Sequence, residues 1–140
     1  MKHIFEQKVY YSDTDSYGVV WHGSYLKWME MGRVDWCENL GFNLVELENN
    51  DIVLPVTNLN IKYKQSARLN DILTVETELI DVSRLSVTFR QVIKVKDSGV
   101  ICTSAEVTIV AINKAGKLYR SFPQVLAEKF EQELKCPELV

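Results

Sequence analysis

Apolar and polar residues follow different patterns along the chain, and each pattern predicts one kind of element. The segment His3–Tyr11 is rich in residues that favour extended backbone, and we predict a strand there. The segment Tyr25–Leu40 repeats apolar residues at helical spacing on more than one stripe, which predicts a long helix buried around much of its circumference. Ser24 suits the N-cap of this helix, and Gly41 suits the residue that ends it.

Alternation of apolar and polar residues begins after this helix, between Ile52 and Leu118, and predicts four strands. They cover Leu59–Tyr63, Leu73–Leu79, Leu85–Val95 and Val100–Ile112. The breaks between them are short and polar, so we expect antiparallel neighbours in a meander. Apolar residues occupy both faces of Val107–Ile112, and we therefore expect another subunit to cover part of the sheet.

The last segment, Pro123–Leu134, predicts a helix with proline near its first turn. Gly32, inside the long helix, costs about 1 kcal/mol relative to alanine, and we attribute it to a close approach of helix and sheet. The order of elements predicts an α+β fold, an antiparallel sheet of about five strands wrapped around one long central helix, with a short C-terminal helix. Residues 1–140 are expected to form a single domain.

Composition narrows the function classes. The 140 residues carry a net charge of −3 with scattered basic residues, which gives no electrostatic footprint for nucleic acid. The N-terminus has no continuous apolar run of a signal peptide, and no window is apolar enough for a membrane-spanning helix. The cysteines Cys37, Cys102 and Cys136 are far apart and lack a CxxC spacing. We therefore expect free thiols in a reducing compartment and a cytoplasmic protein.

Candidate chemistry is concentrated in the connection Tyr10–Tyr25, YYSDTDSYGVVWHGSY, between the first strand and the long helix. It carries Asp13, Asp15 and His22, and loops between rigid elements commonly hold functional groups. The aspartates are alternatively turn caps, and His22 is alternatively a packing residue. No metal site is indicated, because the DxDxxG spacing lacks the later ligands of a calcium loop and no cysteine or histidine cluster suits zinc.

The connection fits a longer frame, Y-x-D-T-D-x-x-G-V-V-x-H-x-x-Y. Its fixed positions are Tyr11, Asp13, Thr14, Asp15, Gly18, Val19, Val20, His22 and Tyr25. Together with the predicted elements, this frame resembles the hotdog-fold thioesterases, specifically the 4-hydroxybenzoyl-CoA thioesterase-like group of acyl-CoA hydrolases. The resemblance extends to about Pro123, and it implies a hotdog fold that hydrolyses acyl-CoA thioesters to free acid and coenzyme A.

The resemblance also implies roles for individual residues. The second aspartate of the frame, here Asp15, is the catalytic carboxylate, as nucleophile or as general base. The helix start around His22 and Gly23 is expected to hold the thioester carbonyl, where backbone N–H groups polarise it. We predict Asp15 and His22 as catalytic residues, with His22 orienting substrate or water. The predicted substrate-binding residues are Gly18, Val20, Trp21, Gly23, Tyr25 and Glu30.

Some alternatives stay open at this point. Glu30 has the simpler alternative of an i,i+3 ion pair with Arg33. A hotdog dehydratase would need a histidine and a carboxylate facing each other across a subunit interface, whereas His22 and Asp15 share one loop. A non-catalytic module that binds acyl-CoA or an acyl carrier is the other alternative. Short aliphatic, long-chain and aromatic acyl groups all fit the frame.

Partners follow from the resemblance. Family members are dimers or tetramers with the active site at a subunit interface, and we expect a homotetramer. Coenzyme A is part of the substrate, so no cofactor is expected. Recruitment to an acyl carrier protein or a membrane-associated complex stays open.

Overall fold

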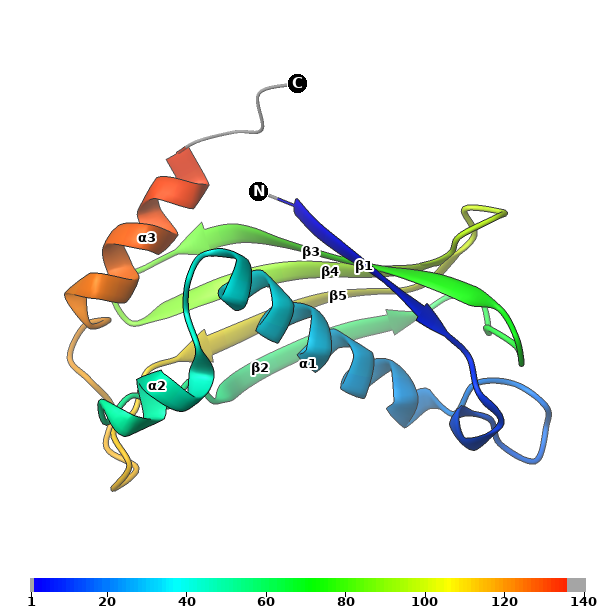
Figure 1. The fold of residues 1–140 in the computed structure, drawn as a ribbon, viewed down its shortest axis with the longest axis horizontal. Helices are drawn as coiled ribbons and strands as arrows, with labels where there is room; N and C mark the ends of the chain where they lie inside the picture. The colour runs from blue at the N-terminus through cyan, green and yellow to red at the C-terminus, as the bar shows by residue number, and fades with distance from the viewer. Residues whose placement is uncertain (1, 136–140) are drawn as a thin grey trace.

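The computed structural model describes residues 2–135. Five strands form one antiparallel sheet that curves around the helix α1 (Figure 1). The strands are β1 (Lys2–Lys8), β2 (Val56–Tyr63), β3 (Ile72–Val82), β4 (Ser86–Val95) and β5 (Ile101–Val110), and the helices are α1 (His22–Asn39), α2 (Leu44–Asn49) and α3 (Gln124–Lys135). The predicted α+β architecture is confirmed, including the terminal helix.

The strand order is β1-β3-β4-β5-β2. The predicted meander is confirmed for β3, β4 and β5, and it is wrong for β2, which pairs with β5 at the edge opposite β1. Residues 64–71 connect β2 to β3 past the positions of β5 and β4. Three strand spacings amount to about 14 Å, and an extended segment of this length spans up to about 26 Å. A short connection therefore does not require the strands that it joins to be neighbours.

The first strand is shorter than predicted. It ends at Lys8, so Tyr10 and Tyr11 belong to the following loop. A 3₁₀ turn over Tyr11–Asp13 replaces extended backbone there, because the Tyr10 N–H donates to the Asp13 carboxylate (2.9 Å) and the Asp13 N–H donates back to the Tyr10 carbonyl (2.9 Å). Both tyrosine side chains are exposed as a result.

Helix α1 begins three residues earlier than predicted, at His22, and its N-cap residue is Trp21. Ser24 lies in the first turn, where its hydroxyl donates to the Asp13 carbonyl (3.2 Å) and does not cap the helix. The predicted end of the helix is confirmed. Gly41 follows the last turn with a φ of +90°, the left-handed conformation that glycine adopts without strain.

Two buried apolar clusters lie between α1 and the sheet. Trp28 belongs to the cluster at the N-terminal half of α1, and Trp36 belongs to the cluster that α3 closes with Phe130, 5.9 Å away between ring centroids. Gly32 lies between them, where an added Cβ would be 2.7 Å from the Thr77 hydroxyl oxygen. The predicted close approach of helix and sheet is therefore confirmed.

A buried polar unit supports α1 at this point. Gln91 on β4 is fully buried, and its Nε2 donates to the Met29 carbonyl and to the Thr77 hydroxyl, both at 2.8 Å. Its carbonyl oxygen accepts a hydrogen bond from Arg33 Nη1 (2.9 Å). The ion pair considered between Arg33 and Glu30 does not form, because Gln91 holds the guanidinium. Burial lowers the pKa of Arg33, and the negative charge of Glu30 opposes that shift.

Cys37 and Cys102, the two cysteines within residues 2–135, are buried free thiols, as predicted. Burial raises the pKa of each thiol to about 11. Cys136 lies outside the described residues.

The sheet face that points away from α1 is mostly polar. Arg90 lies between Glu78 (3.6 Å) and Glu106 (3.8 Å) on the two neighbouring strands. Within Val107–Ile112, the outward Thr108 hydroxyl is hydrogen-bonded to a threonine on β4 (3.0 Å). The outer apolar surface is therefore smaller than this run predicted.

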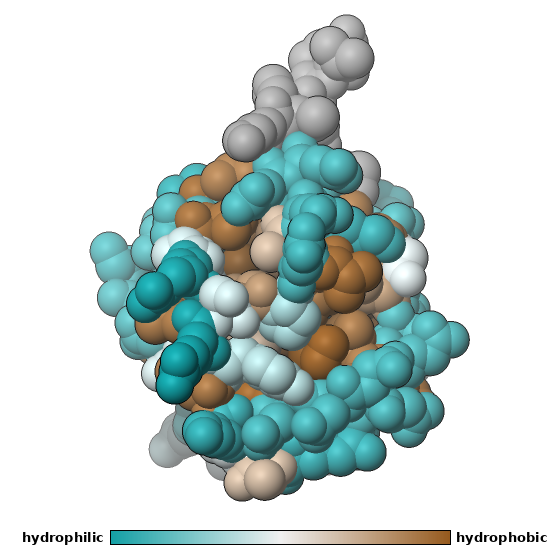
Figure 2. Space-filling model, turned by 90° about the vertical axis from the view of Figure 1, so that its left-hand side faces the viewer, coloured by the Kyte–Doolittle hydropathy of each residue, from teal (hydrophilic) through white to brown (hydrophobic). Residues whose placement is uncertain are grey.

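The end of the molecule formed by α2 and α3 shows apolar side chains between hydrophilic ones (Figure 2). Val45 and Val125 are exposed on these two helices. No helix within residues 2–135 is long and apolar enough to cross a membrane. The residues with candidate chemistry lie at the opposite end, where the loop meets the start of α1 (Figure 1).

Candidate active site

Asp13 ties the loop to the start of α1. Its side chain is buried, and its carboxylate accepts the Tyr10 N–H. Its carbonyl oxygen accepts both the Trp21 N–H (2.8 Å) and the Ser24 hydroxyl (3.2 Å). These contacts give Asp13 a structural role, in line with the turn-cap alternative for the aspartates.

Asp15 follows two residues later and is only half-buried. Its Oδ1 accepts the Tyr17 N–H (2.8 Å), and its backbone pairs with Val19 and Gly18 to close a tight turn. Gly18 has a φ of +77° in this turn, which explains the glycine. Within residues 2–135, Oδ2 of Asp15 accepts no hydrogen bond, and the residue borders an open hollow of about 490 Å³. One carboxylate oxygen thus shapes the loop, and the other is available.

The first turn of α1 has no cap. Trp21 supplies no side-chain hydrogen bond to the helix, and no acidic residue lies in the first turn. No acceptor in the described part of the chain takes the backbone N–H of His22 or Gly23. The first turn therefore combines the positive end of the helix dipole with two N–H groups that have no protein partner within residues 2–135.

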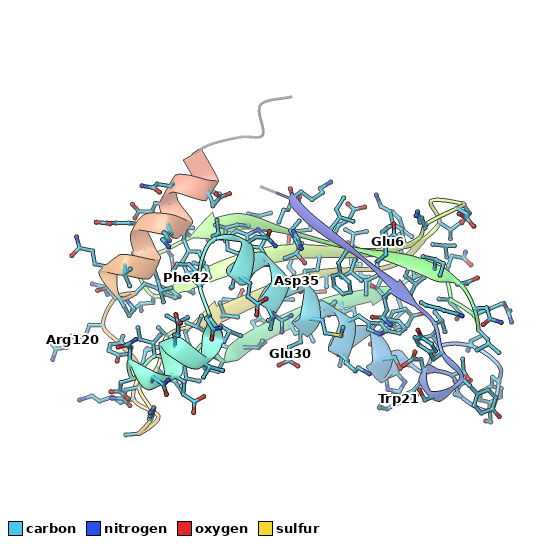
Figure 3. The ribbon with its side chains drawn as sticks, in the orientation of Figure 1. Glu6, Trp21, Glu30, Asp35, Phe42 and Arg120 are labelled. Carbon is cyan, nitrogen blue, oxygen red and sulfur yellow. The ribbon has the colours of Figure 1, made fainter. Side chains whose placement is uncertain are left out.

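Trp21 covers part of this helix start. An added Cβ at Gly23 would clash with the Trp21 indole, so the missing side chain makes room for the indole. The indole itself is 53% exposed, and Figure 3 shows Trp21 at the N-terminal end of α1. Trp21 is therefore a partly solvent-exposed wall beside the helix start.

His22 presents an exposed ring beside this wall. Its ring centroid lies 5.1 Å from that of Trp21 and 6.3 Å from that of Tyr63, which meets it edge-on. The Tyr63 hydroxyl donates to the His22 carbonyl (3.1 Å). Tyr63 was not predicted as a site residue. Its place in an alternating strand does not indicate a site residue, because the contact with His22 joins residues 41 positions apart through the sheet topology.

The other predicted site residues lie apart from the loop surface. Val20 and Tyr25 are buried, and the Tyr25 hydroxyl accepts the Ala67 N–H (3.0 Å). Burial also raises the pKa of Tyr25. Glu30 lines a separate cavity of about 190 Å³ with Arg33, and eight residues of helix place it about 12 Å along α1 from the first turn (Figure 3).

The Asp13 carbonyl joins the loop to the first turn of α1, whereas the hollow beside Asp15 is lined by loop residues and Leu69 and not by Trp21, His22 or Gly23. A carboxylate with a free oxygen supplies a nucleophile or a base, and backbone donors on a helix dipole stabilise negative charge on a carbonyl oxygen. The sheet wrapped around one long central helix is the arrangement that the sequence predicted as a hotdog fold.

Comparison with known proteins gives the family. Residues 17–102 match the family model described as the thioesterase superfamily. The chain is 30% identical over 125 residues to the acyl-CoA thioester hydrolase YbgC of Escherichia coli O157:H7, covering 89% of this chain and 92% of that protein. It is 32% identical over 122 residues to the long-chain acyl-CoA thioesterase FadM of Escherichia coli K12, covering 86% and 91%.

Solved structures agree. The DHNA-CoA thioesterase from Staphylococcus aureus superposes with a TM-score of 0.85 at 30% identity, covering 94% of this chain and 89% of that one. The chain belongs to the thioesterase superfamily and is a thioester hydrolase of the hotdog fold. The match to the family model begins at residue 17, after Asp15, so it says nothing about the role predicted for Asp15.

Proposed function

We propose that the protein hydrolyses acyl-CoA thioesters, with Asp15 as the catalytic carboxylate and the N-terminus of α1 polarising the thioester carbonyl. The proposal rests on three polar groups without a protein partner within residues 2–135, one in the loop and two in the first turn of α1. Oδ2 of Asp15 and the N–H groups of His22 and Gly23 have no hydrogen-bond partner in the described part of the chain. The Asp13 carbonyl joins the loop to the first turn of the helix.

The chemistry needs little else. Asp15 either attacks the thioester carbon to form a mixed anhydride, which water then cleaves, or removes a proton from the attacking water. In both routes the carbonyl oxygen gains negative charge, which the N–H groups of the first turn stabilise. The coenzyme A sulfur leaves as a thiolate, and His22 orients the substrate or the water from the rim of the site.

The relatives support the substrate class and leave the acyl group open. YbgC, FadM and the Staphylococcus aureus enzyme are all named for thioester hydrolysis, and the acyl groups in their names differ. We propose that Gly18, Trp21 and Gly23 border the thioester and that the acyl group extends along α1 toward Glu30. Val20 and Tyr25 support this surface from the core behind it.

We also propose a homodimer or homotetramer, joined at least in part through β2. The outer edge of this strand has no neighbour in the sheet, and Val56, Leu59 and Tyr63 on it are exposed at 44%, 38% and 47%. An unpaired, apolar edge strand is a template for pairing with another chain. Light scattering at micromolar concentration tests this, and a monomer contradicts it. The buried free thiols support our placement of the enzyme in the cytoplasm.

The experiment is release of free thiol from a panel of acyl-CoAs, with wild type and Asp15→Asn side by side. Asparagine keeps an oxygen for the Tyr17 N–H, so the loop retains its turn. We expect the variant to lose roughly 100-fold or more in rate, and the panel to rank the acyl groups. Full activity in the variant would show that another group is the catalyst, and binding of acyl-CoA without thiol release by wild type would identify a non-catalytic module.

A further inference from the structure

The first turn of α1 is held from outside the helix. A helix start is usually secured by a side-chain cap, and α1 has none. Two of its external contacts come from the Asp13 carbonyl, which accepts the Trp21 N–H and the Ser24 hydroxyl. The third comes from Tyr63 at the end of the edge strand β2, whose hydroxyl donates to the His22 carbonyl (3.1 Å).

Unlike the two Asp13 contacts, the Tyr63 contact acts on the His22–Gly23 peptide group. The His22 carbonyl and the Gly23 N–H belong to the same planar peptide group, so a bond that fixes the oxygen also fixes the direction of the N–H. A hydrogen bond into a peptide carbonyl also polarises the N–H on the other side of that peptide and strengthens it as a donor. The Gly23 N–H is one of the two donors left open at the site.

The Tyr63 ring is itself oriented. It meets the ring of His22 edge-on (6.3 Å, 88°) and the ring of Tyr25 at a steep angle (5.8 Å, 63°). The Tyr25 hydroxyl is fixed in turn by the Ala67 N–H. Aromatic neighbours on two sides therefore aim the Tyr63 hydroxyl at the first turn of α1.

We infer that Tyr63 is a positioning residue for the hydrolysis, aiming and polarising the Gly23 N–H through the His22–Gly23 peptide. The inference rests on the proposed function, because it assumes that this N–H stabilises the thioester oxygen. Tyr63 acts only through the peptide and supplies no reacting atom. Burial raises the pKa of Tyr63, so its hydroxyl keeps its proton and stays a donor at neutral pH.

The test compares two tyrosines that make the same kind of bond. Tyr63→Phe removes the hydroxyl and keeps the ring contacts with His22 and Tyr25. The matched control is Tyr119→Phe, which removes a hydrogen bond from a tyrosine hydroxyl to the Asp51 carbonyl (2.6 Å) on the other side of the molecule. A purely structural role would make the two variants alike in activity.

We expect Tyr63→Phe to lower kcat roughly tenfold with KM within twofold, less than the 10²–10³ that loss of a direct oxyanion donor costs. Tyr119→Phe should keep wild-type kcat, and both variants should stay folded by circular dichroism. A Tyr63→Phe enzyme with kcat within twofold of wild type, or no lower than that of Tyr119→Phe, overturns the inference.

A second readout needs no activity. In ¹H–¹⁵N spectra, the Gly23 amide proton should move upfield in Tyr63→Phe and stay in place in Tyr119→Phe, because a weaker polarisation shields that proton. An unmoved Gly23 resonance overturns the inference. If wild type hydrolyses no acyl-CoA, the proposed function has failed, and the Gly23 resonance still decides whether Tyr63 acts on this peptide.

Discussion

The middle of α1 and its first turn differ in how closely they are packed and in how many of their polar groups have partners. In the middle, Gly32 lies against the sheet, and the Gln91 amide has partners for both its nitrogen and its oxygen. In the first turn, two N–H groups have no partner within the described residues, and the covering side chain, Trp21, is half-exposed. The buried polar groups in the middle of α1 are satisfied within the protein, whereas the N–H groups of the first turn are left to solvent or a ligand.

Both Gly32 and Gly23 lack room for a side chain, and substitution at these two positions should give the largest difference in stability between the middle and the first turn of α1. An added Cβ clashes with the Thr77 hydroxyl and Val75 at Gly32, and with the exposed Trp21 indole at Gly23. We expect Gly32→Leu to lower the free energy of unfolding by about 3 kcal/mol, because packed strands cannot move aside. Gly23→Leu should cost about 1 kcal/mol or less, because the indole swings into solvent.

Urea unfolding measures both values. Equal losses in the two variants would show that the first turn is packed as rigidly as the middle, and would remove the basis for the contrast.

Burial of Cys37 on α1 should make the free energy of unfolding depend on pH in the alkaline range. Burial raises the pKa of Cys37 from 9.0 to about 11, so the folded protein keeps this thiol protonated while the unfolded chain loses the proton above pH 9. The stabilisation is present below pH 9 and is lost as pH rises toward 11, by about 2 kcal/mol. Urea unfolding between pH 8 and 11 should therefore show a smaller decline in Cys37→Ala than in wild type. Parallel declines would contradict the burial of this thiol.

The smallest expected change in stability comes from adding a cap to the first turn of α1, and it should be accompanied by a change in activity. Trp21→Asp places a capping carboxylate at the N-cap of α1, where it accepts the N–H of Gly23. We expect a gain of about 0.5 kcal/mol in the free energy of unfolding together with a loss of thioesterase activity, because the cap occupies a donor that the substrate needs. Trp21→Ala is the control, since it removes the indole and adds no cap. A stabilised Trp21→Asp enzyme with the activity of that control would show that this donor is not used.

Local patterns in the sequence predicted the elements because local physics sets them. Alternation located the strands, helical spacing located α1, and Gly41 marked its end. The position of β2 at the far edge could not be derived, because a short connection permits several strand orders. The start of α1 was misplaced because Ser24 is a suitable cap by composition, whereas the Asp13 carbonyl, brought near by the loop, takes its hydroxyl.

The candidate site was predicted only where its residues are close in sequence. Asp13 and Asp15 lie in one loop, His22 begins α1 directly after it, and all three were singled out by their spacing. Tyr63 reaches the site from another strand, and Gln91 takes Arg33 from the partner predicted for it. Both contacts depend on the three-dimensional register of the sheet, which no local pattern encodes.

The two aspartates of the loop give the most direct test of the central claim. Thiol release and urea unfolding would be measured together for wild type, Asp15→Asn and Asp13→Asn on the best acyl-CoA of the panel. We predict that Asp15→Asn loses roughly 100-fold or more in rate at nearly unchanged stability. Asp13→Asn should also keep nearly wild-type stability, because asparagine retains an oxygen for the Tyr10 N–H, and should retain far more of the rate. An Asp15→Asn enzyme that is as active as Asp13→Asn would contradict the assignment of Asp15 as the catalytic carboxylate.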